Sequence, residues 1–209
     1  MSSSEGDGVG RSSLEGVFRT GEAGRGAYLS RLFAFFSEEV VRHWAADGRA
    51  PYRDLGRPTV CDEAGKYHTL DFTLERRSDG ARFIGELKCE IQFENYKYMT
   101  LAGPDQVVHH DGGAAFERLT RMAREPRSHR VTINGKEQPV NGAILLWGVV
   151  TPEGRRSVMD HYGFADVLAI EDILIDLAAW KPAAWAEWVG RRRRWTDELF
   201  GWMAHPVEE

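Results

Sequence analysis

Hydrophobic and polar residues alternate in two neighbouring stretches of the chain. The first stretch, 67–75, has its apolar side chains at even positions and its polar ones, Asp71 among them, at odd positions. In the second, 83–92, Glu86 and Lys88 share a polar side with later residues, and Ile84 is the exception. Alternation of this period predicts two half-buried strands. The Asp79-Gly80 pair between them predicts a two-residue hairpin turn.

The hairpin brings three charged side chains to one face. A turn centred on Asp79-Gly80 places Asp71 directly across from Lys88 and diagonal to Glu86. Directly opposed side chains start about 5 Å apart at Cβ and diagonal ones about 7 Å apart. Two carboxylates at this separation can converge on one divalent cation. For a single Glu-x-Lys, a salt-bridged solvent face is the alternative.

The rest of the chain predicts alternating helices and strands. The patterns predict helices at about 28–46, 113–125 and 171–180, and a C-terminal helix from Pro182. Further strands are expected at 58–62, 142–150 and 166–170, with a small hairpin at Asn134-Gly135 inside 131–140. The 142–150 segment is apolar on both sides, as a central strand covered by helices requires.

With Asp71 on one strand, Glu86-Leu87-Lys88 on the next and helices on either side, the chain resembles the PD-(D/E)XK nuclease superfamily. This superfamily includes restriction endonucleases, Holliday junction resolvases and phage exonucleases. The resemblance covers most of the chain, and Leu70 stands where the motif name has proline. It implies an α/β fold with a restriction endonuclease-like αβββαβ core, a mixed central sheet flanked by helices, and here an added C-terminal helical segment.

The resemblance also implies a metal-dependent hydrolysis of phosphodiester bonds, most simply in DNA. Asp71, Glu86 and the backbone carbonyl of Leu87 would hold Mg²⁺ or Mn²⁺ through hard oxygen ligands. Lys88 would orient or deprotonate the attacking water. Glu90 and Gln92, on the same strand side, could hold a second ion. A module that keeps the nuclease fold and binds nucleic acid or protein without cutting is the alternative function.

An acidic residue on the first helix is a further candidate for the site. Several members of the resembled family carry one there that reaches the metal. A helical wheel puts Glu39 at the edge of the apolar stripe and Glu38 opposite the stripe. Glu39 is therefore the expected catalytic residue, and an ion pair with Arg42 or Arg31 is the alternative.

Composition restricts where nucleic acid could bind. The 209 residues carry a net charge of -5, with 42% hydrophobic and 28% charged residues. Such a chain fits a soluble globular protein, and phosphate contacts must come from local patches. Arg118, Arg121 and Arg124 recur every third residue on the 113–125 helix and could follow a phosphate backbone. A solvated face is the alternative.

The chain is expected to form one domain from residue 27 to 209 after a disordered Gly/Ser-rich tail at 1–26. No apolar run is long enough to span a bilayer and no signal peptide is evident, which favours a cytoplasmic protein. Cys61 and Cys89 are expected to be buried thiols.

Tryptophans recur along the C-terminal helix. Trp185, Trp188, Trp195 and Trp202 follow a three-four spacing with Leu199, and Arg191–Arg194 flank them. This stripe favours core packing or contact with a second copy or partner subunit over base stacking. The arginine run splays around the helix and favours a solvated or partner-facing role.

Overall fold

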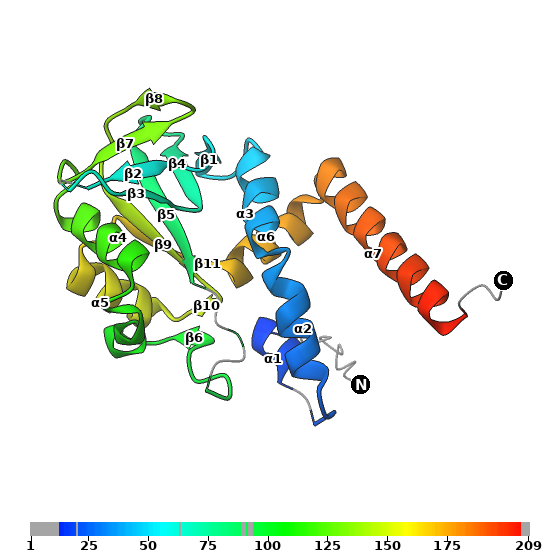
Figure 1. The fold of residues 1–209 in the computed structure, drawn as a ribbon. Helices are drawn as coiled ribbons and strands as arrows, with labels where there is room; N and C mark the ends of the chain where they lie inside the picture. Colours follow the sequence, from blue (N-terminus) through cyan, green and yellow to red (C-terminus); the bar gives the residue numbers. More distant parts are fainter. Residues whose placement is uncertain (1–12, 20, 63, 89–90, 92–93, 206–209) are drawn as a thin grey trace, which may run out of the picture.

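A mixed five-stranded sheet forms the centre of the molecule (Figure 1). The computed structural model describes residues 13–19, 21–62, 64–88, 91 and 94–205. The sheet has the order β1 (Tyr52–Asp54), β4 (Phe72–Arg76), β5 (Arg82–Lys88), β9 (Ala143–Trp147) and β11 (Asp166–Ala169). The first three strands are antiparallel, and β9 and β11 run parallel to β5. The protein is therefore an α/β protein with a mixed central sheet flanked by helices, as expected.

Helices cover both faces of this sheet. On one face, α4 (Ala114–Arg124) and α5 (Pro152–Tyr162) pack on Ile84 of β5 and the odd residues of β9. On the other, α3 (Ser37–Ala46) and α6 (Ile170–Trp180) pack on Phe83, Ile144 and their neighbours. All five residues of β9 are buried, which explains why this segment is apolar on both sides.

Two smaller sheets complete the strands. A four-stranded sheet has the order β3 (Tyr67–Thr69), β2 (Thr59–Cys61), β7 (Arg130–Ile133) and β8 (Lys136–Glu137). The expected Asn134-Gly135 turn joins β7 to β8, and both turn residues have positive φ. A short parallel pair joins β6 (Thr100–Leu101) to β10 (Val149–Val150). Two single-turn 3-10 helices, η1 (Pro104–Gln106) and η2 (Val108–His110), precede α4.

The stretch expected as one strand at 67–75 is two strands. β3 belongs to the smaller sheet and β4 to the central sheet, and the chain bends between them at Leu70 and Asp71. The strand expected at 58–62 corresponds to β2, which pairs with β3 and β7 and lies outside the central sheet. The three-stranded antiparallel unit of the central sheet begins with β1, a three-residue strand that the pattern did not predict.

The turn between β4 and β5 also differs from the expectation. Phe72 pairs with Gly85 and Glu75 with Arg82, so four residues, 77–80, connect the strands instead of two. The Asp79 carboxylate accepts a hydrogen bond from the Ala81 N–H at 3.1 Å and pairs with Arg76, which stabilises the wider loop. The ladder is therefore shifted by two residues. Because side chains alternate with a period of two, the shift changes the pairing and keeps each side chain on its expected face.

The expected helix at 28–46 is divided into α2 (Arg25–Ala34) and α3, with a break at Phe35 and Phe36. Phe33 of α2 lies against Phe18 and also packs on the edge of the cluster beneath the central sheet. Val40 and Trp44 of α3 are buried within that cluster. The expected tail also ends earlier than residue 26, because α1 (Leu14–Phe18) is helical and buries Phe18.

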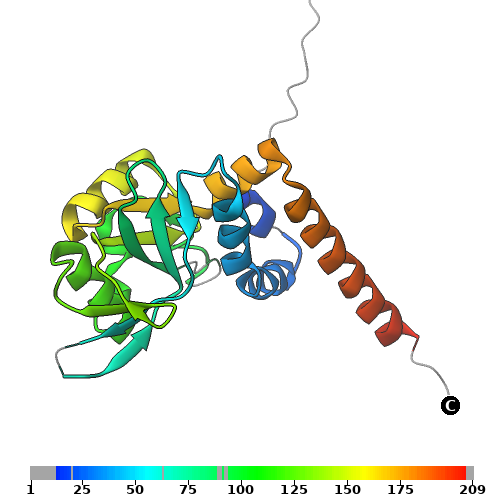
Figure 2. The ribbon, with the colours of Figure 1, turned by 90° about the horizontal axis from the view of Figure 1, so that it is seen from above.

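A long helix, α7 (Ala183–Ala204), follows α6 as expected and runs away from the sheet (Figures 1 and 2). Pro182 stands at its N-cap. The helix α5, which has only three buried residues, was not expected from the pattern. No helix among the described residues is long and apolar enough to cross a membrane. Cys61 is buried as expected, and Cys89 lies outside the described residues.

Candidate active site

Asp71 lies at the bend where the chain passes from β3 to β4. Its Oδ2 accepts a hydrogen bond from the backbone N–H of Leu87 at 2.9 Å. Its Oδ1 accepts one from Nη2 of Arg57 at 3.2 Å. The side chain is 16% exposed. Leu87 lies two residues beyond Gly85, the last residue of β5 that pairs with β4. Its hydrogen bond therefore fixes the Asp71 carboxylate against the carboxyl end of β5.

Glu86 and Lys88 are at the carboxyl end of β5. Lys88 Nζ lies 2.9 Å from Oε1 of Glu86, and the two side chains are 24% and 9% exposed. Among the described residues, Oε2 of Glu86 is buried and has no hydrogen-bond partner. A buried carboxylate oxygen without a partner is costly, because it has lost its water without replacement.

The pairing of these residues corrects the expected geometry. The β4–β5 ladder ends at Phe72 and Gly85, and Asp71 lies beyond it at the bend, where its carboxylate accepts the Leu87 N–H. The expected pairing of Asp71 directly across from Lys88 is therefore not formed. Glu86 and Lys88 share one face of β5 and contact each other, but this face is not free of the core. Ile84, two residues before Glu86, is fully buried beneath α4.

Burial and charge act together on the two carboxylates. Burial raises the pKa of Glu86, and the nearby Asp71 raises it further, while Lys88 lowers it. Burial also raises the pKa of Asp71; the Leu87 N–H opposes this shift, and the charge of Glu38 adds to it. Both ionised forms are therefore disfavoured in the protein alone, and a nearby positive charge would stabilise them.

Of the two glutamates on α3, Glu38 is the one whose charge acts on Asp71. The negative charge of Glu38 contributes to the pKa shifts of both Asp71 and Asp54. Glu39 acts on the pKa of His43, whose ring packs against Trp185 and Trp188 of α7. The helical wheel treated 28–46 as one helix, whereas the structure divides it at Phe35 and Phe36.

Arg42 forms ion pairs with both Glu38 and Glu39. The pair with Glu39 is the alternative role that the sequence had offered for Glu39. The Arg42 guanidinium lies 2.7 Å from Glu38 and 2.9 Å from Glu39. It also lies 3.9 Å from Asp54 at the end of β1, and Asp54 is only 12% exposed. Burial raises the pKa of Asp54.

Sequence reasoning missed Arg57, which contacts Asp71, and Asp54, which lies near Arg42. Asp54 follows a strand too short for its alternation to be detected, and its one local signal is the Asx-type contact to the Gly56 N–H at 2.9 Å. Arg57 is in the loop between β1 and β2, and no motif marks it. Its side chain is 52% exposed, so one side of its guanidinium remains open to solvent beside Asp71.

The expected row of arginines on α4 does not form a common phosphate-binding face. Arg118 is 11% exposed and pairs with Asp62 at 2.6 Å. Arg124 donates to the carbonyl of His161 at 2.9 Å. Arg121 and Arg124 are both exposed, so of the three only Arg118 is largely withdrawn from solvent.

Two expected contributors lie outside the described residues, namely Glu90 and Gln92. Within the described part of the chain, no group of three or more His, Cys, Asp or Glu side chains is arranged to hold a metal ion. The Asp71–Glu86 pair with the Leu87 carbonyl is thus a set of two carboxylates and one backbone oxygen. In an extended strand the N–H and C=O of one residue point to the same edge, so the Leu87 carbonyl lies on the edge that faces Asp71.

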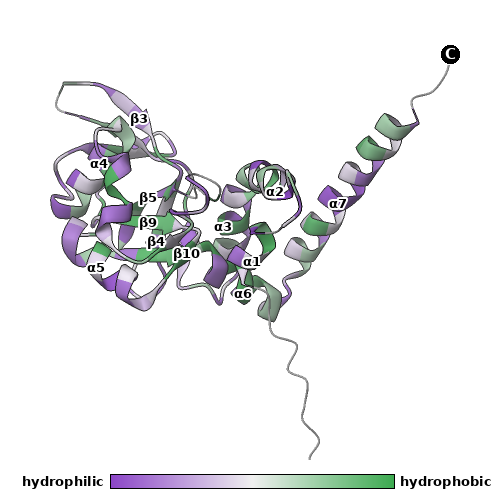
Figure 3. Cartoon of the chain, turned by 90° about the horizontal axis from the view of Figure 1, so that it is seen from below, coloured by the Kyte–Doolittle hydropathy of each residue, from purple (hydrophilic) through white to green (hydrophobic). Residues whose placement is uncertain are grey.

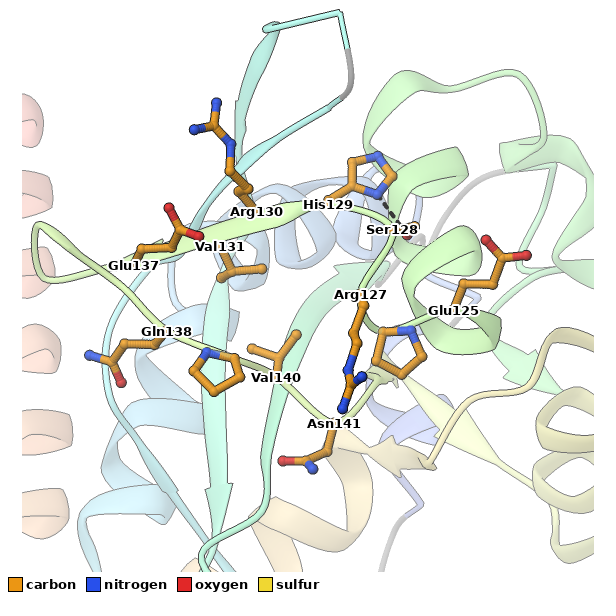
Figure 4. A pocket seen from close by; sticks show the side chains of 12 residues that line it. Glu125, Arg127, Ser128, His129, Arg130, Val131, Glu137, Gln138, Val140 and Asn141 are labelled. Carbon is orange, nitrogen blue, oxygen red and sulfur yellow. Dashed lines mark hydrogen bonds between the residues drawn. The ribbon is translucent and has the colours of Figure 1, made fainter.

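A surface hollow lies elsewhere. It is lined by residues 125–131 and 137–141, next to the β7–β8 hairpin (Figure 4). Its lining includes Glu125, Arg127 and Glu137, and Ser128 Oγ lies 2.8 Å from Nδ1 of His129. The lining carries both signs of charge and none of the carboxylates around Asp71, so the hollow is not part of the candidate site.

No protein-family model, no curated protein and no solved structure matches the chain. The functional argument therefore depends on the geometry of the site.

Proposed function

We propose that the protein is a metal-dependent nuclease that hydrolyses phosphodiester bonds, with Asp71, Glu86 and Lys88 as its catalytic residues. The observation that carries the proposal is the desolvated Asp71–Glu86 pair. Two carboxylates with raised pKa values lie close together at the end of β5, with an unpartnered oxygen on Glu86 and Lys88 beside it. Carboxylates whose pKa is raised by burial beside a specific charge partner are candidates for functional sites.

The order of elements supports the finer fold assignment. α3 is followed by the antiparallel strands β1, β4 and β5, then by α4 and by β9 parallel to β5. This is the αβββαβ order of the restriction endonuclease-like core that the chain resembles. Asp71 immediately precedes the second strand of this unit, and Glu86-Leu87-Lys88 ends the third.

The donor set fits a hard divalent cation. Asp71, Glu86 and the Leu87 carbonyl offer oxygen ligands of the kind that Mg²⁺ and Mn²⁺ prefer. A positive charge there would offset the repulsion between the two carboxylates and satisfy the unpartnered oxygen of Glu86. When bound, such an ion supplies Lewis-acid polarisation of a phosphate and acidification of a bound water.

The remaining work falls to the protein's own side chains. Glu86 holds the ammonium group of Lys88 at the rim of the site, where Lys88 orients a water toward the phosphorus and offsets developing charge. Arg57, held by Asp71 and partly exposed, can donate to a phosphate oxygen. Glu38 replaces Glu39 as the acidic residue of α3 that supports the site.

A substrate panel tests the proposal. The protein is incubated with supercoiled plasmid, branched DNA and single-stranded RNA, each with Mg²⁺, Mn²⁺ or EDTA. We expect cleavage of at least one substrate that EDTA abolishes, with DNA the expected target. Tight binding of every substrate without cleavage under any ion would favour the non-cleaving module. In that case, the Asp71–Arg57 and Glu86–Lys88 pairs would only be structural ion pairs.

A further inference from the structure

The C-terminal helix α7 exposes an apolar seam that its own domain covers only at one end. Side chains at alternating steps of three and four form this seam, namely Trp185, Trp188, Arg192, Trp195, Leu199 and Trp202. Such spacing is that of the core positions of a coiled coil. No residue of this fully described helix is buried. Figure 3 shows apolar bands continuing along α7 as it leaves the domain.

The first turns of the seam already have a partner in the same chain. The Trp185 and Trp188 rings stack with centroids 5.3 Å apart, and both pack edge-on or tilted against His43 of α3. Trp188 also meets Phe36. Both tryptophans remain partly exposed on their other sides.

The second half of the seam is open. Trp195, Leu199 and Trp202 are 48%, 57% and 61% exposed, and Met203 beside them is 58% exposed. Phe200 touches Tyr28 of α2, with ring centroids 6.5 Å apart, yet both rings stay about half exposed. Monomeric proteins seldom leave apolar groups of this size contiguous and uncovered.

The two terminal segments outside the described residues offer few apolar side chains. Residues 1–12 and 206–209 contain no aromatic side chain, and their larger apolar residues are Met1, Val9 and Val207. The occupant of the seam must therefore bring its own apolar face. A second α7 has one of the same spacing.

The charges beside the seam favour a second copy in the antiparallel direction. Arg191 and Glu198 are exposed on the same flank of the seam, one turn before Trp195 and one turn before Trp202. In a parallel pair, Arg191–Arg194 of the two copies would lie side by side and repel. In an antiparallel pair, Arg191 of each copy can form an ion pair with Glu198 of the other. The two-fold axis of such a dimer makes these two ion pairs equivalent.

The same alignment matches the apolar positions. It places Leu199 of each copy beside Trp188 of the other, and Trp202 beside Trp185. Arg192, whose guanidinium already lies 4.7 Å from the centroid of the Trp195 ring in its own helix, faces Trp195 of the second copy. Side chains of this size would together remove roughly 1,000 Å² of apolar surface from water, close to the minimum for a specific interface.

We propose that α7 is the dimerisation helix of this protein and pairs antiparallel with α7 of a second copy, with reciprocal Arg191–Glu198 contacts. This inference does not depend on the nuclease proposal. It is tested without nucleic acid, by the molar mass of the full chain in light scattering coupled to size exclusion. At concentrations on the order of 50 μM, where an interface of this size is occupied, we expect twice the chain mass of 23.6 kDa.

Charge reversal distinguishes a second copy from any other occupant. Arg191→Glu and Glu198→Arg should each lower the dimer fraction, because each creates two like-charge contacts. An equimolar mixture of the two variants should restore the dimer mass as a heterodimer. Leu199→Glu should abolish the dimer, and Arg193→Glu, at an outward position that is 84% exposed, should not. Circular dichroism checks that each variant keeps its helix content.

A wild-type protein that stays at 23.6 kDa up to this concentration would overturn the proposal. So would a dimer that Leu199→Glu leaves intact. If the two charge variants remain monomeric when mixed, the antiparallel register is wrong.

Discussion

The carboxylate of Asp71 accepts the backbone N–H of Leu87 at 2.9 Å, in the middle of the Glu86-Leu87-Lys88 triplet. This hydrogen bond joins the bend after β3 to the end of β5 and fixes the distance between the two acidic residues. It also explains how Asp71 can be both desolvated and held in place, because the N–H opposes the rise in its pKa that burial causes.

Lys88 should act on the chemistry and not on metal binding. We expect Lys88→Ala to bind Mn²⁺ with nearly unchanged affinity and to lose about 10²–10⁴-fold in the rate of the chemical step. Calorimetric titration and single-turnover cleavage measure the two effects separately. The matched control is Lys97→Ala, which removes an exposed ammonium that pairs with Glu94. Loss of ion binding in Lys88→Ala would show that the assigned role is wrong.

Glu38 and Glu39 offer a matched pair, because both contact Arg42 and only Glu38 acts on Asp71. Glu38→Gln should raise the Mg²⁺ concentration needed for half-maximal cleavage by about 10-fold, the order seen for residues that support metal ligands. Glu39→Gln should change it little. Equal effects of both variants would contradict the position assigned to α3.

The raised pKa of Glu86 makes a prediction about stability and pH. The folded protein binds the Glu86 proton more tightly than the unfolded chain does. Ionised Glu86 therefore lowers the free energy of unfolding as the pH rises above 4.5, the ordinary pKa of a glutamate. Glu86→Gln removes that cost. We therefore expect a higher Tm than wild type at pH 7 without divalent ions, and a difference that shrinks as pH falls toward 4.5. A lower Tm at pH 7 would mean that the Lys88 ion pair outweighs burial.

Arg118 should behave as a structural residue. Arg118 is 11% exposed and pairs with Asp62 at 2.6 Å, so Arg118→Ala should lower the free energy of unfolding. Arg121→Ala, on the exposed side of α4, should cost much less. If nucleic acid contacts Arg121, its removal should reduce the slope of log affinity against log salt by about one. Urea denaturation measures the change in unfolding free energy, and anisotropy titrations at several salt concentrations measure the slope of binding affinity.

Much of the fold follows from local patterns. The sequence pattern correctly predicted the strands β5, β9 and β11 and the helices α4, α6 and α7. Each has a clear pattern of apolar residues, and in the three strands, α4 and α6 these apolar residues are the ones that pack in the structure. Pro182 marks the start of α7, and the Asn134-Gly135 turn marks the boundary between β7 and β8, because both have restricted backbone geometry. In contrast, β1 has only three residues, and α5 buries too little apolar surface to show a helical stripe, although Thr151 and Pro152 form a standard helix start.

The sequence predicted which residues form the candidate site, but not how they are placed relative to one another. The alternation correctly placed Glu86 and Lys88 on one face of β5, and the shifted register leaves that result unchanged. The position of Asp71 depends on the bend between β3 and β4, which no local pattern predicts. The charge of Glu38 acts on Asp71, and the pattern at 28–46 did not show the break at Phe35 and Phe36 that precedes α3.

The central claim is that Asp71 belongs to a metal-dependent catalytic site. The most direct measurement is the Mn²⁺-dependent cleavage rate of a fluorescent DNA substrate by wild type, Asp71→Ala and Asp160→Ala, the last a control at an exposed aspartate of α5. We predict cleavage by wild type and Asp160→Ala that EDTA abolishes, and a loss of at least about 10³-fold in Asp71→Ala with its fold intact by circular dichroism. Cleavage by Asp71→Ala at the wild-type rate would contradict the account.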